Sequence, residues 1–88
     1  NADDRAKRAF VVSELSWTWR PPERDRLLVK IRHGPDLRDA TVRWIDEQRM
    51  EVTMDRADRG VAPGQFAVFY DGEVCLGCGT IADDAGGE

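Results

Sequence analysis

The chain has 88 residues, of which 17 are acidic and 13 are basic, giving a formal net charge of −4 at pH 7. No stretch approaches the roughly 18 consecutive apolar residues of a membrane helix, and no signal-peptide pattern opens the sequence. Two cysteines are too few to frame a secreted disulfide scaffold, so length and composition predict one small, soluble intracellular domain with a single core.

The two ends of the chain differ from its middle. Residues 1–9 contain no core-forming apolar side chain, and we interpret them as a disordered or cloning-derived segment ahead of a domain cut from a longer protein. The domain is expected to span residues 10–82. Residues 83–88 carry three acidic side chains and no basic one, which predicts a flexible acidic tail.

Two strand-like runs open the domain. Residues 10–15 are β-branched and aromatic, and the run continues to Trp19, where Pro21-Pro22 stops it by removing two backbone donors. Residues 24–33 alternate apolar and polar side chains with the period of two that is typical of a half-buried strand.

Two further runs follow. Residues 40–45 alternate in the same way and lead into the polar turn Asp46-Glu47-Gln48. Residues 50–55 show the clearest alternation of the chain, with Met50 and Met54 on one face as packing residues. Residues 55–60 are charged and rich in turn formers, so we expect a loop there.

The last third of the sequence predicts a hairpin that organises the rest. Residues 66–70 and 73–81 are the expected strands. Asp71-Gly72 between them predicts a type I′ turn, because glycine accepts positive φ and aspartate tolerates it. Ahead of the hairpin, Pro63-Gly64 predicts a second tight turn, with proline fixing φ at the first central position and glycine taking positive φ at the second.

Six strand-like runs at roughly ten-residue spacing predict an all-β antiparallel fold, either a sandwich or a small barrel. A six-stranded barrel is favoured because closure removes two exposed edge strands. Gly77 and Gly79 agree with a barrel, since glycine inside a strand marks a bend, a bulge or the close approach of another backbone.

The sequence Cys75-Leu76-Gly77-Cys78 invites a zinc or redox interpretation. Zinc needs four ligands and only His33 is left to join the thiols, while a thioredoxin-type motif would lead into a helix. In a strand the two thiols point to opposite faces unless a bulge intervenes. We therefore favour one buried thiol, one small strand residue and no metal site. His33, the only histidine, is interpreted as a strand-end side chain without an acid–base partner.

Basic residues gather in the middle of the chain, where seven bases and four acids fall between Arg20 and Arg43. They form either a solvated face or a surface that contacts phosphates. The candidates for RNA contact are Arg20, Arg24, Lys30, Arg32, Arg38 and Arg43. Trp17, Trp19 and Trp44 could stack on bases, but their strand positions favour the core, with Trp19 as the exception beside the Pro-Pro loop.

Residues 62–72, with the sequence APGQFAVFYDG, and the CLGCG that follows them resemble the C-terminal signature of the tRNA-specific 2-thiouridylases. The matching structural positions are Pro63, Gly64, Gln65, Tyr70, Asp71, Gly72, Cys75, Leu76, Gly77 and Gly79. Residues 12–17 and 29–32 resemble, more loosely, the segments that open the same domain, so the resemblance covers about residues 10–82.

This resemblance implies a six-stranded barrel similar to the second domain of elongation factor Tu, at the end of a longer enzyme that uses ATP with Mg²⁺ to thiolate the wobble uridine of tRNA. The family's ATP-binding SGGxDS loop and its two catalytic cysteines belong to an N-terminal domain that these 88 residues do not contain. Cys75 thus matches only the terminal motif, and Cys78 replaces the usual glycine or serine. The implied partners are the anticodon arm of tRNA, the N-terminal catalytic domain and sulfur-donor proteins, with no cofactor in the barrel itself.

We therefore expect an accessory, tRNA-positioning barrel of a tRNA-uridine 2-sulfurtransferase that is inactive by itself, because the chain offers no nucleophile with a base and no paired carboxylates. Two alternatives remain open, namely a tRNA- or protein-binding barrel of a translation factor, and a CxxC metal or redox module. Arginine outnumbers lysine by 11 to 2, which is typical of a GC-rich genome and favours a bacterial cytoplasm over a mitochondrion.

Overall fold

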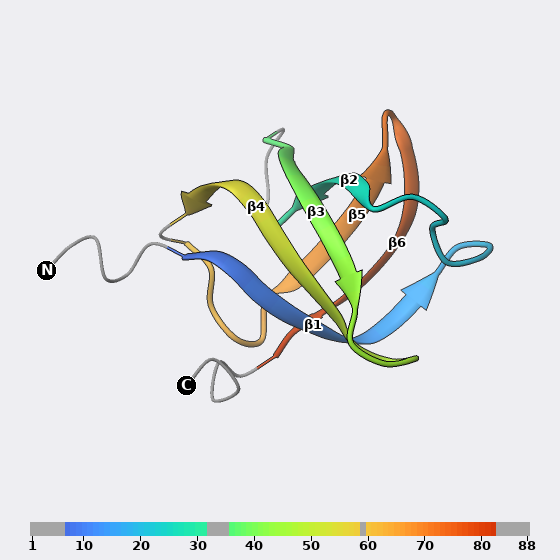
Figure 1. Cartoon of the computed structure of the whole chain (residues 1–88), viewed down its shortest axis with the longest axis horizontal. Coiled ribbons are helices and arrows are strands. Elements are labelled where there is room, and N and C mark those ends of the chain that lie inside the picture. The colour runs from blue at the N-terminus through green and yellow to red at the C-terminus, as the bar shows by residue number, and fades with distance from the viewer. Residues whose placement is uncertain (1–6, 32–35, 59, 83–88) are drawn as a thin grey trace, which may run out of the picture.

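The computed structural model describes residues 7–31, 36–58 and 60–82. They form six strands, which are β1 (Lys7–Trp17), β2 (Arg26–Lys30), β3 (Arg38–Trp44), β4 (Met50–Asp58), β5 (Phe66–Asp71) and β6 (Val74–Ile81). All neighbours pair antiparallel, and the order β1-β4-β3-β2-β5-β6 closes into a barrel (Figure 1). The predicted all-β, six-stranded antiparallel barrel is confirmed. No helix long and apolar enough to cross a membrane occurs within these described ranges.

The core fills the barrel with the side chains that the period of two directs inward. In β4, Met50, Val52 and Met54 are fully buried, as their alternation predicts. Phe69 of β5 is also fully buried, and the ring of Trp17 packs on it with 5.7 Å between ring centroids. Trp44 meets Trp17 edge to face at 6.0 Å but is 38% exposed, so it lies at the margin of the core.

A bulge in β1 lets this one strand close the barrel. Its register shifts between Ser13 and Ser16 where it pairs with β6, and Glu14 has a φ of 53°, the only positive value at a non-glycine residue of the described chain. The first half of β1 pairs with β4 and its second half with β6. The bend brings the two backbones close together, and Gly77 and Gly79 are the β6 residues at this contact.

The turn at Pro63-Gly64 is confirmed. Gly64 has a φ of 91°, and the Gln65 N–H donates to the Ala62 carbonyl at 3.3 Å. The Gln65 side-chain oxygen accepts a hydrogen bond from the Ala62 N–H at 2.9 Å, and the Gln65 carbonyl accepts one from the Ile81 N–H at 2.8 Å. Gln65 therefore holds the turn in shape and joins it to the end of β6.

The prediction of a type I′ turn at Asp71-Gly72 is wrong. Asp71 belongs to β5 and pairs with Val74, so the two loop residues are Gly72 and Glu73. Positive φ falls on Gly72 alone, at 62°, which is the pattern of a type II′ turn with glycine first. Because Asp71 still pairs with Val74, β5 extends one residue further than predicted, and the turn lies one residue later in the chain.

Several strand ends also differ from the sequence prediction. β1 begins at Lys7, three residues ahead of the predicted start, and ends at Trp17. β2 is shorter than residues 24–33, and Arg32 and His33 lie outside the described residues, as do residues 1–6 and the predicted tail 83–88. The loop predicted at residues 55–60 is wrong for its first part, because β4 continues to Asp58 and pairs there with Lys7.

Asp58 explains why β4 extends into a charged segment. Its side chain is only 2% exposed, forms an ion pair with Arg38 at 2.7 Å and accepts a hydrogen bond from the Gly60 N–H at 2.6 Å. A buried carboxylate is tolerated when charged and backbone donors satisfy it. Arg38 therefore ties the start of β3 to the end of β4.

Candidate nucleic-acid interface

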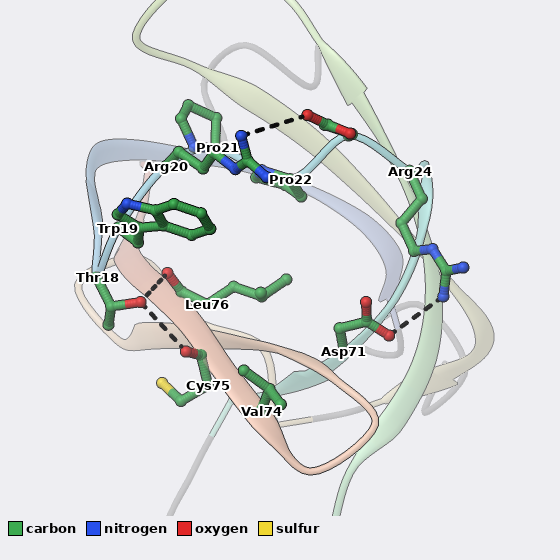
Figure 2. A pocket seen from close by; sticks show the side chains of 11 residues that line it. Thr18, Trp19, Arg20, Pro21, Pro22, Arg24, Asp71, Val74, Cys75 and Leu76 are labelled. Carbon is green, nitrogen blue, oxygen red and sulfur yellow. Dashed lines mark hydrogen bonds and ion pairs between the residues drawn. The ribbon is translucent and has the colours of Figure 1, made fainter.

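A hollow of about 580 Å³ lies between the loop that follows β1 and the β5–β6 hairpin. Trp19, Arg20, Pro22 and Arg24 line it from the loop, and Asp71, Val74 and Leu76 line it from the hairpin. Figure 2 shows Trp19 on one side of the hollow and the pair Arg24–Asp71 on the opposite side. Arg20 and Arg24, two of the predicted RNA-contact residues, are thus brought to one site.

Thr18 fixes the start of this loop. Its N–H donates to the Leu76 carbonyl at 2.8 Å, and its hydroxyl donates to the Leu76 and Cys75 carbonyls at 3.0 and 3.3 Å. These bonds carry the β1–β6 pairing one residue beyond Trp17, after which the backbone bends away. Pro21-Pro22 then limits the freedom of the loop by fixing φ twice.

Trp19 and Arg20 form an exposed stacked pair. Trp19 is 80% exposed, the highest value among the large hydrophobic side chains of the described chain. The Arg20 guanidinium carbon lies 4.1 Å from the centroid of its ring, within the range of a cation–π contact. Trp17 packs inward because it still belongs to the strand, whereas Trp19 follows the bend and faces solvent. The expectation that Trp19 lies outside the core is confirmed, whereas Trp44, expected in the core, is 38% exposed.

The two arginines of the hollow are held by exposed carboxylates. Arg24 donates to Asp71 at 3.2 Å, with side chains 66% and 47% exposed, and Arg20 lies 3.9 Å from Glu23. Exposed pairs of this kind contribute about 0.2–1 kcal/mol, so their opening costs little. Both guanidinium groups can therefore turn to a phosphate.

The other predicted RNA-contact residues do not join this site. Arg38 is engaged by buried Asp58, and Arg43 donates twice to Glu51, its direct neighbour across β3 and β4, at 3.1 and 2.7 Å. The Lys30 ammonium lies 5.6 Å from the ring centroid of Tyr70 on the outside of β2 and β5. Arg32 lies outside the described residues.

Arg26, absent from the predicted set, forms the best-aligned surface ion pair of β2 and β4. It donates to both carboxylate oxygens of Asp55, at 2.8 and 2.9 Å, and also to Thr41 at 3.0 Å. The hydrogen bond to Asp55 raises the pKa of Arg26, and the same bond lowers the pKa of Asp55 below its ordinary value. The outer face of these strands is thus a set of matched charges.

Removal of the Asp55 charge is expected to change the stability of the fold in a pH-dependent way. Because the pKa of Asp55 is lower in the folded than in the unfolded state, its ionised form stabilises the fold above the ordinary value of 3.8, and this contribution disappears as pH falls through the folded-state pKa. Asp55→Asn is expected to lower the Tm slightly at about pH 7, and this difference should shrink as the pH is lowered below the ordinary value of 3.8. Thermal unfolding followed by circular dichroism tests this, with Glu73→Gln in the exposed turn as the charge control. A Tm difference that stays constant as the pH falls from about 7 to about 2 contradicts it.

The cysteines are placed differently from the prediction of one buried thiol. Phe69 pairs with Gly77 and Tyr70 with Cys75, so Leu76 is an extra residue that bulges β6. As a result both cysteines lie opposite outward-facing residues of β5, with Cys75 exposed and Cys78 partly buried, and both thiols are free. Within the described ranges no three His, Cys, Asp or Glu side chains gather as a metal site.

The sequence does not predict Thr18 as a site residue. It predicts Trp19 as a possible stacking residue, but the six candidates for RNA contact do not include it. A tryptophan directly before Arg-Pro-Pro was the available signal for the exposed pair. The role of Thr18 depends on carbonyls of β6 that are 57 and 58 residues away in sequence, which no local pattern reveals.

Comparison with known proteins gives consistent matches. A family model described as the aminomethyltransferase β-barrel domain matches residues 7–81. The tRNA-specific 2-thiouridylase MnmA of Shewanella amazonensis is 47% identical over 72 residues, covering 80% of this chain and 19% of that protein. The MnmA proteins of Exiguobacterium sibiricum and Aeromonas hydrophila are each 42% identical, over 81% and 82% of this chain and 20% of their own lengths.

The chain therefore spans about a fifth of the length of the curated relatives it matches. The matched region, residues 7–81, includes every strand of the barrel and the whole of the signature hairpin. The resemblance to the 2-thiouridylases is confirmed by these matches, and the chain belongs to the aminomethyltransferase β-barrel domain family, in the form that tRNA-specific 2-thiouridylases contain.

Proposed function

We propose that this barrel is an accessory domain of a tRNA-specific 2-thiouridylase and helps to position tRNA, near its anticodon arm, for thiolation of the wobble uridine. In this proposal the catalytic domain lies elsewhere in a longer polypeptide, where it binds ATP with Mg²⁺ and receives sulfur from donor proteins. The 88-residue chain alone is then inactive. We place the enzyme in a bacterial cytoplasm.

The observation that carries the positioning role is the grouping of Trp19, Arg20 and Arg24 around one hollow. An exposed aromatic ring with guanidinium groups beside it is the combination that proteins use for RNA, because the ring stacks on bases and the cations meet phosphates. Arg38 of β3 is paired with the buried carboxylate of Asp58, and Arg26 and Arg43 are paired with Asp55 and Glu51 on the strands. Arg20 and Arg24 are paired too, with Glu23 and Asp71, but they lie in a hollow beside an exposed tryptophan. The tryptophan is therefore what favours the hollow as the place where RNA binds.

Binding of an RNA hairpin by the 88-residue chain tests this function. With about two phosphate contacts, the logarithm of the binding constant is expected to fall with the logarithm of salt concentration with a slope of about −1.4 to −1.8. Fluorescence anisotropy of a labelled hairpin at several salt concentrations measures the slope. The proposed role is contradicted if the chain does not bind the hairpin at low salt, or if its binding constant does not change with salt concentration.

A further inference from the structure

We infer that the hollow receives one unpaired nucleotide of the RNA, with its base stacked on Trp19 and its phosphate at Arg24. The inference rests on the proposed function and adds to it the kind of RNA element that the site binds. Three features of the hollow support it: a stacking surface, an arginine whose exposed ion pair opens at little cost, and walls that are held in place.

The stacking surface is the indole of Trp19. Arg20 covers no more than one face of this ring, yet Trp19 is 80% exposed, so its other face is open to solvent. A base laid on this face continues a stack of guanidinium, indole and base, an arrangement that tolerates any base because each has a π-face. A base inside a duplex is already stacked on both faces, which restricts this contact to an unpaired nucleotide.

Arg24 supplies the phosphate contact across the hollow from Trp19 (Figure 2). Its only ion pair among the described residues is the exposed one with Asp71 at 3.2 Å, and a phosphodiester offers the same kind of oxygen acceptors. Asp71 therefore competes with the phosphate for Arg24. Neutralising Asp71 should strengthen RNA binding, whereas neutralising Arg24 should weaken it.

Contacts with the barrel support the walls of the hollow. Its volume of about 580 Å³ falls in the range of ordinary small-ligand sites. Thr18 anchors the loop to the carbonyls of Cys75 and Leu76, and Pro21-Pro22 limits its motion. Leu76 is partly buried against the core, so the floor of the site belongs to the barrel itself. Little ordering is then needed when a nucleotide enters.

The first test compares two RNA probes with the 88-residue chain, a hairpin with an unpaired loop and a fully paired duplex with the same number of phosphates. The hairpin is expected to bind about tenfold more tightly than the duplex. Trp19→Ala is expected to lower the affinity for the hairpin about tenfold and to leave the affinity for the duplex unchanged. Trp19→Phe, which keeps an aromatic ring, should retain most of the preference.

The second test uses charge changes of opposite expected sign. Asp71→Asn should tighten hairpin binding about two- to fivefold, and Arg24→Gln should weaken it by a similar factor. Glu47→Gln, in the exposed β3–β4 turn, removes the same charge away from the hollow and should change little. A damaged fold cannot explain tighter binding by Asp71→Asn.

The outcomes separate the two proposals. Equal binding of hairpin and duplex, with no effect of Trp19→Ala, overturns the nucleotide site and leaves the positioning role standing. A Trp19→Ala variant that loses hairpin and duplex binding equally also overturns it. Failure of the chain to bind either RNA at low salt contradicts the proposed function itself. Opposite effects of Asp71→Asn and Arg24→Gln, with a hairpin preference that depends on Trp19, support the nucleotide site.

Discussion

Replacing Gly77 with alanine is expected to lower the free energy of unfolding by about 3 kcal/mol. A Cβ atom at this position would press on the Ser16 carbonyl oxygen and lie 2.6 Å from Cε3 and 2.8 Å from Cα of Trp17. Two of these three atoms belong to the backbone of β1, so β1 and β6 must separate. The Tm should then fall by about 12–24 °C.

Gly72→Ala is the matched control for this change. Gly72 has a φ of 62° in the β5–β6 turn, but nothing lies within 4 Å of an added Cβ atom. Only the strained backbone conformation is penalised, which costs about 1 kcal/mol. Urea unfolding of the three proteins measures both differences. A Gly77→Ala variant as stable as Gly72→Ala would show that β1 and β6 are not packed as closely as described.

Phe69→Ala is expected to lower the free energy of unfolding by about 3–5 kcal/mol, a large share of the stability of so small a domain. Phe69 is fully buried, and its removal leaves a cavity and withdraws the surface on which Trp17 packs. Because Trp17 directly precedes the loop of the hollow, a variant that still folds should also bind RNA more weakly than the parent protein.

Phe69→Leu keeps most of the side-chain volume and should lower the free energy of unfolding by less than about 2 kcal/mol. Urea unfolding followed by tryptophan fluorescence reports both stability and the environment of Trp17. If Phe69→Ala and Phe69→Leu are equally stable, Phe69 does not fill the centre of the core as the structure places it.

The strands and their inward faces were predictable because each depends on short-range alternation. Met50, Val52 and Met54 follow a period of two and are fully buried, and Pro63-Gly64 forms the turn that its residue types require. Closure into a barrel followed from the number of strands and the short length of the chain.

The exact register was not predictable, because single-residue bulges determine it. Leu76 is an extra residue in β6, and this turns Cys75 to the same side as Cys78 against the expectation for a regular strand. The bulge of β1 places Glu14 in a backbone conformation that its residue type disfavours. Gly77, directly after Leu76, is a local sign of a bend or bulge in β6, but it does not identify the extra residue, and nothing comparable marks the bulge of β1.

The candidate site was predictable only in part. Arg20 and Arg24 are close in sequence and lie on one loop, so they stay together in the fold. Arg38 and Arg43 looked equivalent to them, but both lie on β3, where they pair with Asp58 and Glu51 of β4 and do not line the hollow. The neighbours of a strand arginine come from other strands, and these are known only once the register is fixed.

The central claim is that RNA meets this barrel at the hollow formed by Trp19, Arg20 and Arg24, and two double variants test it most directly. Arg20→Gln/Arg24→Gln and Arg26→Gln/Arg43→Gln remove the same charge from the chain, at the hollow and on the outer face of β2 and β3 respectively. In a low-salt titration with the RNA hairpin, the first variant is predicted to lose about tenfold or more in affinity and the second less than about twofold. Equal losses in the two variants, or a larger loss in the second, would contradict the claim.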